Sequence, residues 1–300
     1  MIHTDTQPTL LNTLTQYIEQ FVRSLAGANK SKLTIQAYRA DIQLFTAWLT
    51  ETDYTVTEVR QITRGHIDDY FAHLHEKGQT GTTRARKLIS LQVFFAYLVE
   101  RGILPSSPAE KIKRPSREEK TRPYLTQEEY RQVLAEAAGN PRDYCILLVF
   151  LHTGIRVSEL VAIRLTDVNE REQQLLVHGK GKRERTIPLE KKPLQAIKLY
   201  RDHHRPRSED ARLFLSETAH EGLTIRSVRK IVDKYVKKAG ITKQVSCHGL
   251  RRTCLSTRAA RKMNAFAIQK LAGHARMETT KIYVELSDED LRYAMESASM

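Results

Sequence analysis

Apolar residues recur every three or four positions through the first third of the chain, the spacing of one face of an α-helix. Four such stripes follow one another: Leu11, Leu14, Ile18, Phe21 and Leu25; Ile35, Tyr38, Ile42, Phe45 and Leu49; Ile67, Tyr70, Phe71 and Leu74; and Leu88, Leu91, Phe95 and Leu98. Turn-forming residues lie between stripes at 27–32 and 76–82. The pattern predicts a bundle of four short amphipathic helices.

The stretch 104–123 breaks this pattern, with four prolines, many charges and few apolar residues. Such a composition is typical of a linker. Thr126 and Glu129 then form a capping box that starts a new helix. We therefore predict a helical domain at 1–107, a linker at 108–122 and a second domain at 123–300, a division that suits a chain of 300 residues.

The second half has a mixed pattern. Two apolar ends flank a Gly-Lys-Gly-Lys turn within 174–189, which predicts a β-hairpin. Helices are expected near 126–138, 142–153, 156–163, 191–203, 224–239, 249–262 and 264–272, and a short amphipathic tail helix at 287–300. The predicted fold class is mainly α with a small β-sheet (α+β): a four-helix bundle followed by a mixed domain.

The charge of the chain is strongly positive. Lysine and arginine number 49 against 35 acidic residues, a net charge of +14. Most of the excess, +11, falls in residues 121–300, and only +3 in residues 1–120. This excess favours a polyanionic partner, with nucleic acid as the first candidate. A basic protein without such a partner is the alternative that charge alone leaves open.

The segment 224–240 predicts a helix that Thr224 caps and Gly240 ends. Its candidate DNA-binding residues lie outside the apolar face: Arg226, Arg229, Lys230 and Lys234. Such a basic face suits DNA phosphates or a groove, but a solvated helix face has the same composition.

Cysteine content and the length of apolar runs indicate the cellular compartment of the protein. The three cysteines, Cys145, Cys247 and Cys254, have no CxxC spacing, so we expect neither a disulfide framework nor a zinc site. The N-terminus lacks the basic and apolar regions of a signal peptide, and the run 145–151 is too short to span a bilayer. We expect a cytoplasmic protein with no membrane association.

Several candidate catalytic side chains are cationic. Arg156 follows a glycine turn, Lys180 lies in the hairpin turn, and His248 and Arg251 are three residues apart, so they share a face if helical. His274 and Tyr283 follow near the end of the chain. Taken singly, a residue of any of these types is more often an ordinary surface or core residue than a catalytic one.

Together these residues match the requirements of phosphoryl transfer at a DNA phosphodiester. Two arginines supply a rigid fork of donors to the oxygens that gain charge in the transition state. Tyrosine is a feasible nucleophile where positive charge or a base assists it. A lysine can protonate the leaving 5′-oxygen, and histidines can transfer protons. This chemistry requires neither a metal ion nor another cofactor.

The motifs "TGIRVSEL", "GKGKRERTIPL", "HGLRRT" and "LAGHARMETTKIYVEL" occur in that order between residues 153 and 286. Their order and spacing resemble those of the tyrosine recombinases, or phage integrase family, and most of all the short bacterial Xer-type members. The segment 31–49 resembles the first half of their N-terminal core-binding (SAM-like) domain. The resemblance covers nearly the whole chain and implies a tyrosine-recombinase catalytic domain after the bundle.

The resemblance also implies roles for the matching residues. Arg156 and Arg251 would hold the scissile phosphate, with Glu159 bracing the arginines, and Lys180 would protonate the leaving oxygen. His248 would assist proton transfer, His274 would bond the phosphate, and Tyr283 would attack it to form a 3′-phosphotyrosine. Arg252 stands where many Xer proteins have a second histidine, a departure that touches none of these roles.

The implied function is site-specific recombination of double-stranded DNA through a Holliday junction. A homo-tetramer would act on two core sites, with or without a partner recombinase, and the tail helix would dock on a neighbouring subunit. The sequence leaves open whether the substrate is a chromosome or plasmid dimer or a mobile element. Three rival functions are a catalytically silent DNA-binding regulator, a type IB topoisomerase-like enzyme and, more remotely, an RNA-binding protein.

Overall fold

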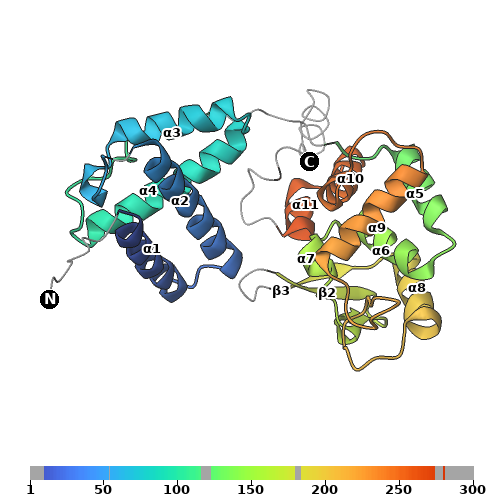
Figure 1. The fold of residues 1–300 in the computed structure, drawn as a ribbon. Helices are drawn as coiled ribbons and strands as arrows, with labels where there is room; N and C mark the ends of the chain where they lie inside the picture. Colours follow the sequence, from blue (N-terminus) through green and yellow to red (C-terminus); the bar gives the residue numbers. More distant parts are fainter. Residues whose placement is uncertain (1–9, 54, 116–122, 180–183, 274–279, 281–300) are drawn as a thin grey trace, which may run out of the picture. The chain divides into compact units, whose positions relative to one another are not determined.

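The computed structural model describes residues 10–53, 55–115, 123–179, 184–273 and 280 (Figure 1). The chain divides into two compact units, residues 1–120 and residues 121–300. Each unit has its own cluster of buried apolar side chains.

The elements of the first unit are all helices among its described residues. Its elements are α1 (Leu10–Gly27), α2 (Lys32–Thr52), the short 3₁₀ turn η1 (Val59–Gln61), α3 (Arg64–Glu76) and α4 (Gly81–Glu100). Ser31 and Thr80 begin α2 and α4 by accepting hydrogen bonds from the backbone N–H groups of the first turn. The four predicted helices are therefore confirmed.

One detail of the first stripe is wrong. Helix α1 buries Leu10, Leu14, Ile18, Phe21 and Leu25, whereas Leu11 is 49% exposed. Leu10 and Leu11 lie about 100° apart around the helix axis, and in α1 only Leu10 faces the core. Aromatic rings fill much of this core: Phe45 meets Tyr70 edge-on, with ring centroids 5.2 Å apart.

The segment after α4 packs on the first unit. Leu104 and Ala109 are buried in its core, and Gln92 Nε2 donates a hydrogen bond to Ala109 O at 3.2 Å. Part of the stretch that we interpret as a linker therefore contributes to this core. The domain limits stay predictions, since residues 116–122 lie outside the described residues.

The described residues of the second unit form the α-helices α5 (Gln127–Ala137), α6 (Pro141–Thr153), α7 (Val157–Leu160), α8 (Lys191–Leu199), α9 (Ile225–Lys238), α10 (Cys247–Ala260) and α11 (Ala265–Ala272). It also contains two short turns: the 3₁₀ turn η2 (Leu165–Asp167) precedes strand β1, and the π-helical turn η3 (Tyr200–His204) follows α8 directly. The helix expected at 156–163 is shorter than predicted, and the one at 191–203 changes to η3 at residue 200.

A three-stranded antiparallel sheet lies beside these helices, in the order β1 (Val168–Asn169), β2 (Gln174–His178) and β3 (Glu184–Pro188). Strands β2 and β3 form the predicted hairpin, in which Leu175 pairs with Ile187 and His178 with Glu184. Leu175, Val177 and Ile187 are buried, so one face of the hairpin packs on the core.

Helix α6 forms the centre of the second unit. Its residues from Cys145 to Phe150 are buried on every side, and it packs against α5, α8 and α10. This explains the apolar run 145–151 as a core helix. Within the described residues, no helix is long and apolar enough to cross a membrane. The predicted fold class, mainly α with a small sheet, is confirmed.

Candidate functional site

Arg156 follows a tight turn between two helices. Helix α6 is followed by Gly154, whose backbone φ of 60° lies in the left-handed region that residues with a side chain rarely adopt. The backbone N–H of Arg156 then donates to Glu159 Oε2 at 2.8 Å, which caps α7. The Arg156 side chain is 44% exposed, so its guanidinium group is accessible to a ligand.

The carboxylate of Glu159 orients two arginines. It is 4% exposed, and each of its oxygens accepts two hydrogen bonds. Arg156 donates from its backbone N at 2.8 Å and from Nη1 at 2.9 Å, and Arg185 donates from Nη1 and Nη2, both at 2.9 Å. Burial raises the pKa of Glu159, but its bonds to Arg185 and Arg156 outweigh burial and lower the pKa below its ordinary value. The carboxylate is therefore ionised at neutral pH.

Arg251 lies on α10 and is 3% exposed. Its Nη1 donates to Gly154 O and its Nη2 to Ala272 O, each at 2.7 Å. Arg156 Nη2 donates to the neighbouring carbonyl, Gly273 O, at 3.1 Å. The two arginines that were predicted from separate motifs therefore meet at one place, the C-terminal end of α11.

Arg185 also belongs to this cluster, although it is not among the site residues predicted from the sequence. It lies on β3, is 14% exposed, and donates from Nε to Leu271 O at 3.2 Å in addition to its two bonds to Glu159. A signal was available: alternation along a strand places Arg185 on the same face as the buried Ile187. A charged side chain on the core face of a strand requires a partner.

His248 lies in the first turn of α10, which begins two residues earlier than predicted. Ser246 Oγ caps this helix by accepting a hydrogen bond from Gly249 N at 3.3 Å. His248 is exposed, and Arg251 lies one turn further along the same side of the helix. The helical geometry that a shared face requires is therefore present.

The other three candidates, Lys180, His274 and Tyr283, lie outside the described residues. Their flanking segments are described: the hairpin strands end at His178 and begin again at Glu184, and α11 ends at Gly273. The structure thus brings Arg156, Glu159 and Arg251 together, and it does not test the positions of these three.

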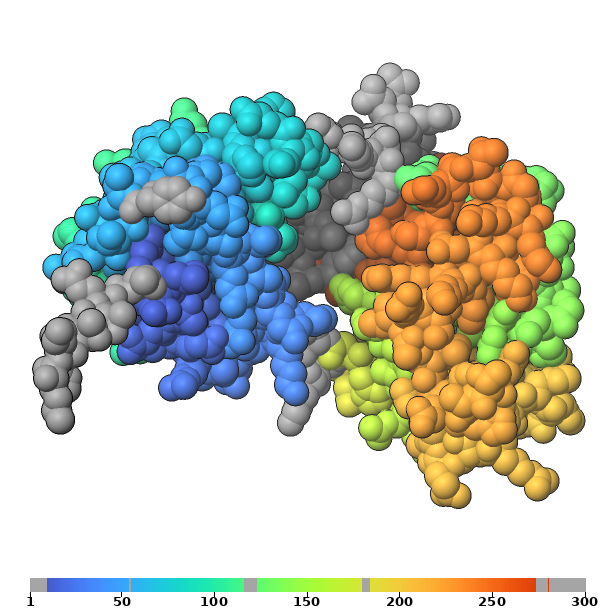
Figure 2. All heavy atoms as spheres, viewed as in Figure 1, coloured from blue at the N-terminus to red at the C-terminus, as the bar shows by residue number. Residues whose placement is uncertain are grey.

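The candidate DNA-binding face on α9 is exposed at Arg226, Arg229 and Lys230. Lys234 is half-exposed, with Nζ donating to Tyr235 Oη at 3.1 Å and lying 3.5 Å from Asp143 Oδ2. Figure 2 shows orange atoms, the colour of this part of the chain, over much of the visible face of the second unit. The basic residues of α9 therefore lie on an accessible surface.

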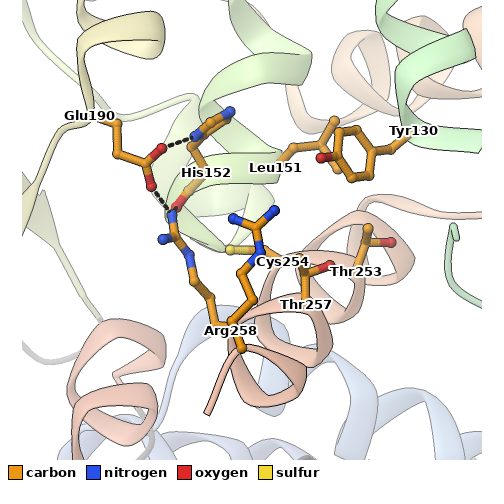
Figure 3. Close-up of a pocket in the computed structure, with 9 residues that line it drawn as sticks. Tyr130, Leu151, His152, Glu190, Thr253, Cys254, Thr257 and Arg258 are labelled. Atoms are coloured by element: carbon orange, nitrogen blue, oxygen red, sulfur yellow. Dashed lines mark hydrogen bonds and ion pairs between the residues drawn. The ribbon is translucent and has the colours of Figure 1, made fainter. Parts of the chain in front are cut away.

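A second polar cluster involves His152 in the last turn of α6 (Figure 3). Glu190 contacts His152 Nδ1 at 3.0 Å and pairs with Arg258, whose Nη2 also donates to His152 O at 3.2 Å. Burial lowers the pKa of His152 despite the opposing effect of Glu190. The adjoining cavity of about 40 Å³ is too small for a nucleotide. The contacts of His152 with Glu190 and Arg258 connect the end of α6 to the start of α8 and to α10.

Two family models match the chain. The model of the phage integrase family covers residues 123–290, and that of the phage integrase N-terminal SAM-like domain covers residues 18–102. Together they span both units and include all the catalytic candidates.

Curated relatives are similar over most of their length. The tyrosine recombinase XerC of Caldanaerobacter subterraneus subsp. tengcongensis is 32% identical, with 93% of this chain and 85% of the relative covered. The tyrosine recombinase XerC of Thermodesulfovibrio yellowstonii is 31% identical, with 93% and 94% covered.

Solved structures share the fold. XerH site-specific recombinase bound to a palindromic difH substrate matches with a TM-score of 0.80 and 16% identity, over 97% of this chain and 98% of that one. The Tn1549 transposon integrase in complex with transposon right end DNA matches with a TM-score of 0.78 and 17% identity, over 96% and 99%. From the family models and the curated relatives, the chain belongs to the phage integrase family, as an Xer-type tyrosine recombinase that cleaves and rejoins DNA at specific sites.

Proposed function

We propose that Arg156 and Arg251 bind the scissile phosphate of double-stranded DNA and that Tyr283 is the nucleophile. One observation supports the first part: two guanidinium groups from different elements converge on adjacent carbonyls, Gly273 O and Ala272 O. Guanidinium groups stay protonated at any physiological pH and match phosphate oxygens geometrically. Two such groups held close together by other parts of the protein can act jointly on a phosphorane-like transition state.

In the proposed reaction, the Tyr283 hydroxyl oxygen attacks phosphorus while the bond from phosphorus to the 5′-oxygen breaks. His248 assists removal of the tyrosine proton, and Lys180 donates a proton to the departing 5′-oxygen. His274 donates a hydrogen bond to the phosphate. The products are a 3′-phosphotyrosine and a free 5′-hydroxyl, and attack by a 5′-hydroxyl on that linkage rejoins the strand without another energy source.

DNA recognition and assembly extend the proposal. Arg226, Arg229, Lys230 and Lys234 on α9 contribute phosphate contacts, whose loss would weaken binding and reduce its salt dependence. Four copies assemble on two core sites and exchange strands through a Holliday junction, with or without a partner recombinase. The substrate is a DNA dimer or a mobile element, and the protein acts in the cytoplasm on the nucleoid.

Covalent trapping tests the nucleophile. The full chain is incubated with nicked duplexes that carry candidate Xer-type core sites, EDTA is added, and denatured samples are examined for a protein–DNA adduct. We expect an adduct that persists with EDTA and disappears in Tyr283→Phe. Tyr124→Phe, at a tyrosine that is 43% exposed and outside the cluster, should retain it.

The alternatives predict different results. DNA binding with no adduct on any candidate site would favour a catalytically silent regulator of the same fold. An adduct accompanied by relaxation of supercoiled DNA, with no resolution of a synthetic Holliday junction, would favour a type IB topoisomerase-like enzyme.

The tail at 287–300 lies outside the described residues, and its role is a separate proposal. We infer that it docks on a neighbouring subunit and couples the activities of adjacent protomers. Deletion of 287–300 should reduce cooperative assembly on paired core sites in gel-shift titrations. Unchanged cooperativity and unchanged activity on single half-sites would contradict this role.

A further inference from the structure

Three consecutive carbonyl groups at the end of α11 are bonded to three different arginines. Leu271 O accepts from Arg185, Ala272 O from Arg251, and Gly273 O from Arg156, at 3.2, 2.7 and 3.1 Å. The last carbonyls of a helix have no partner within the helix and carry partial negative charge. Three guanidinium groups therefore satisfy and fix a helix end that leads directly into the segment containing His274 and Tyr283.

Arg185 makes three side-chain hydrogen bonds to two partners among the described residues. Its guanidinium group makes a two-bond fork with Glu159, and its Nε reaches Leu271 O. Gly273 packs directly on it, since a Cβ at that position would lie 2.9 Å from Arg185 Nη1. Arg185 thus touches both the end of α11 and the carboxylate that orients Arg156, and its strand β3 begins four residues after Lys180 in the sequence.

We propose that Arg185 is a positioning residue for DNA cleavage, which fixes the C-terminal end of α11 against the Glu159 carboxylate that orients Arg156. This inference rests on the proposed function of Arg156 and Tyr283. Arg185 bonds a carboxylate, a carbonyl and the surface of a glycine. It therefore acts through its neighbours and not on the phosphate itself.

The geometry requires arginine at this position. Arg185 bonds both oxygens of Glu159 and Leu271 O from three separate nitrogens. A lysine has a single nitrogen, so it preserves the charge but cannot bond to both groups with good geometry. Arg185→Lys therefore removes the positioning contacts while the positive charge stays, and a displaced catalytic segment costs about 100-fold in rate.

Arg142 provides a matched control elsewhere in the second unit. It is 13% exposed, its Nε and Nη2 donate to the buried carboxylate of Asp143 at 3.0 and 2.8 Å, and its Nη1 donates to Leu215 O at 3.3 Å. It has the same kinds of partner as Arg185 but none of the cluster residues. Arg142→Lys therefore reproduces the loss of stability without disturbing the end of α11.

The experiment compares both variants with the unmodified full chain on a nicked core-site duplex. Adduct formation is followed in a single turnover at saturating protein, and DNA affinity and melting temperature are measured separately. We expect Arg185→Lys to lower the saturated cleavage rate about 100-fold with nearly unchanged affinity, and Arg142→Lys to lower only the melting temperature. Near-normal cleavage by a folded Arg185→Lys, or an equal loss in Arg142→Lys, would overturn the proposal.

A second pair of variants tests the same proposal if Arg185→Lys does not fold. Gly273→Ala pushes a methyl group into Arg185, whereas Gly240→Ala introduces the same left-handed strain, at φ of 70° instead of 63°, with no atom within 4 Å. We expect only Gly273→Ala to slow cleavage, and equal rates in the two would overturn the proposal. Tyr283→Phe distinguishes failure of the proposed function from failure of the positioning role. If Tyr283→Phe still forms the adduct, the proposed function is wrong. If Tyr283→Phe forms no adduct but the Arg185 or Gly273 variant cleaves at the normal rate, only the positioning role is wrong.

Discussion

The two units are stabilised by different kinds of contact. In the first unit, aromatic rings pack together: Phe21 meets Phe94 with centroids 5.5 Å apart, and Phe45 meets Tyr70 at 5.2 Å. The core of the second unit is mainly aliphatic, and arginines join its loops by donating to backbone carbonyls. Arg142, Arg205 and Arg258 do so away from the site, as Arg156, Arg185 and Arg251 do within it.

Because of this difference, the stability of the fold and the geometry of the site depend on different contacts. Apolar packing is non-directional and depends on volume, so its loss appears mainly in the free energy of unfolding. Hydrogen bonds from guanidinium groups depend on direction, so a substitution at the site displaces groups that must align with a phosphate. We expect core changes in the first unit to alter folding most, and arginine changes in the second unit to alter the chemical step most.

The largest expected effect is on the aromatic core. Phe45→Ala should lower the free energy of unfolding of the first unit by about 3–5 kcal/mol, because it removes a fully buried ring. Trp48 is the one tryptophan in the chain and packs beside Phe45, so its fluorescence during urea unfolding reports on this unit. Leu33→Ala, at a side chain 78% exposed, is the control. Equal midpoints for the two variants would contradict the assignment of this core.

Arg251→Lys tests the other side of the comparison. A lysine cannot donate to both Gly154 O and Ala272 O and also offer a planar fork to a phosphate. We expect the single-turnover cleavage rate to fall about 10²–10³-fold, while the Trp48 unfolding midpoint stays unchanged. Arg261→Lys, at an exposed residue just after α10, should cleave normally. A shift of the Trp48 midpoint by Arg251→Lys would show that the two kinds of contact are not separable.

The smallest effect concerns pH and the hairpin. The hydrogen bond from His178 to Asp167, aided by Glu184, raises the pKa of His178. Its stabilising contribution is therefore complete below the unfolded pKa of about 6.5 and is lost as pH rises through the folded value.

We expect His178→Gln to be less stable than the unmodified chain near about pH 6, by less than about 1 kcal/mol because the side chain is well solvated, and the gap to close near about pH 9. Calorimetric melting temperatures at both pH values measure this gap. His75→Gln, at an exposed residue of α3, serves as the control. A gap that widens with pH would contradict the assigned protonation.

Periodicity made the helices and the hairpin predictable from the sequence. The stripes on α3 and α4 are buried as expected, because a helix exposed to water on one side must place its apolar residues on the other. The register of α1 was harder, since Leu10 and Leu11 are both leucine and only the packed structure selects between them. The motifs also pointed to Arg156, Glu159 and Arg251, three side chains that the structure brings to one helix end.

Arginine-to-carbonyl contacts were not predictable in the same way. Every residue has a carbonyl group, so no residue type marks Leu271 or Ala272 as an acceptor for an arginine far away in the sequence. The contact of Arg185 with Leu271 O is of this kind, whereas its position on the same strand face as Ile187 is visible in the sequence. The partner of a buried charge depends on which chain segments pack together in the fold. Hydrophobic periodicity predicts each segment but not which segments are in contact.

The arginines at the end of α11 also constrain the length of that helix. Each residue added to an α-helix advances the chain by about 1.5 Å and turns it by about 100°. An insertion or deletion within Ala265–Ala272 would therefore present a different set of carbonyls to Arg156, Arg185 and Arg251. Homologous chains should then differ in length within exposed connections such as 217–221, and keep the residue count of α11 constant.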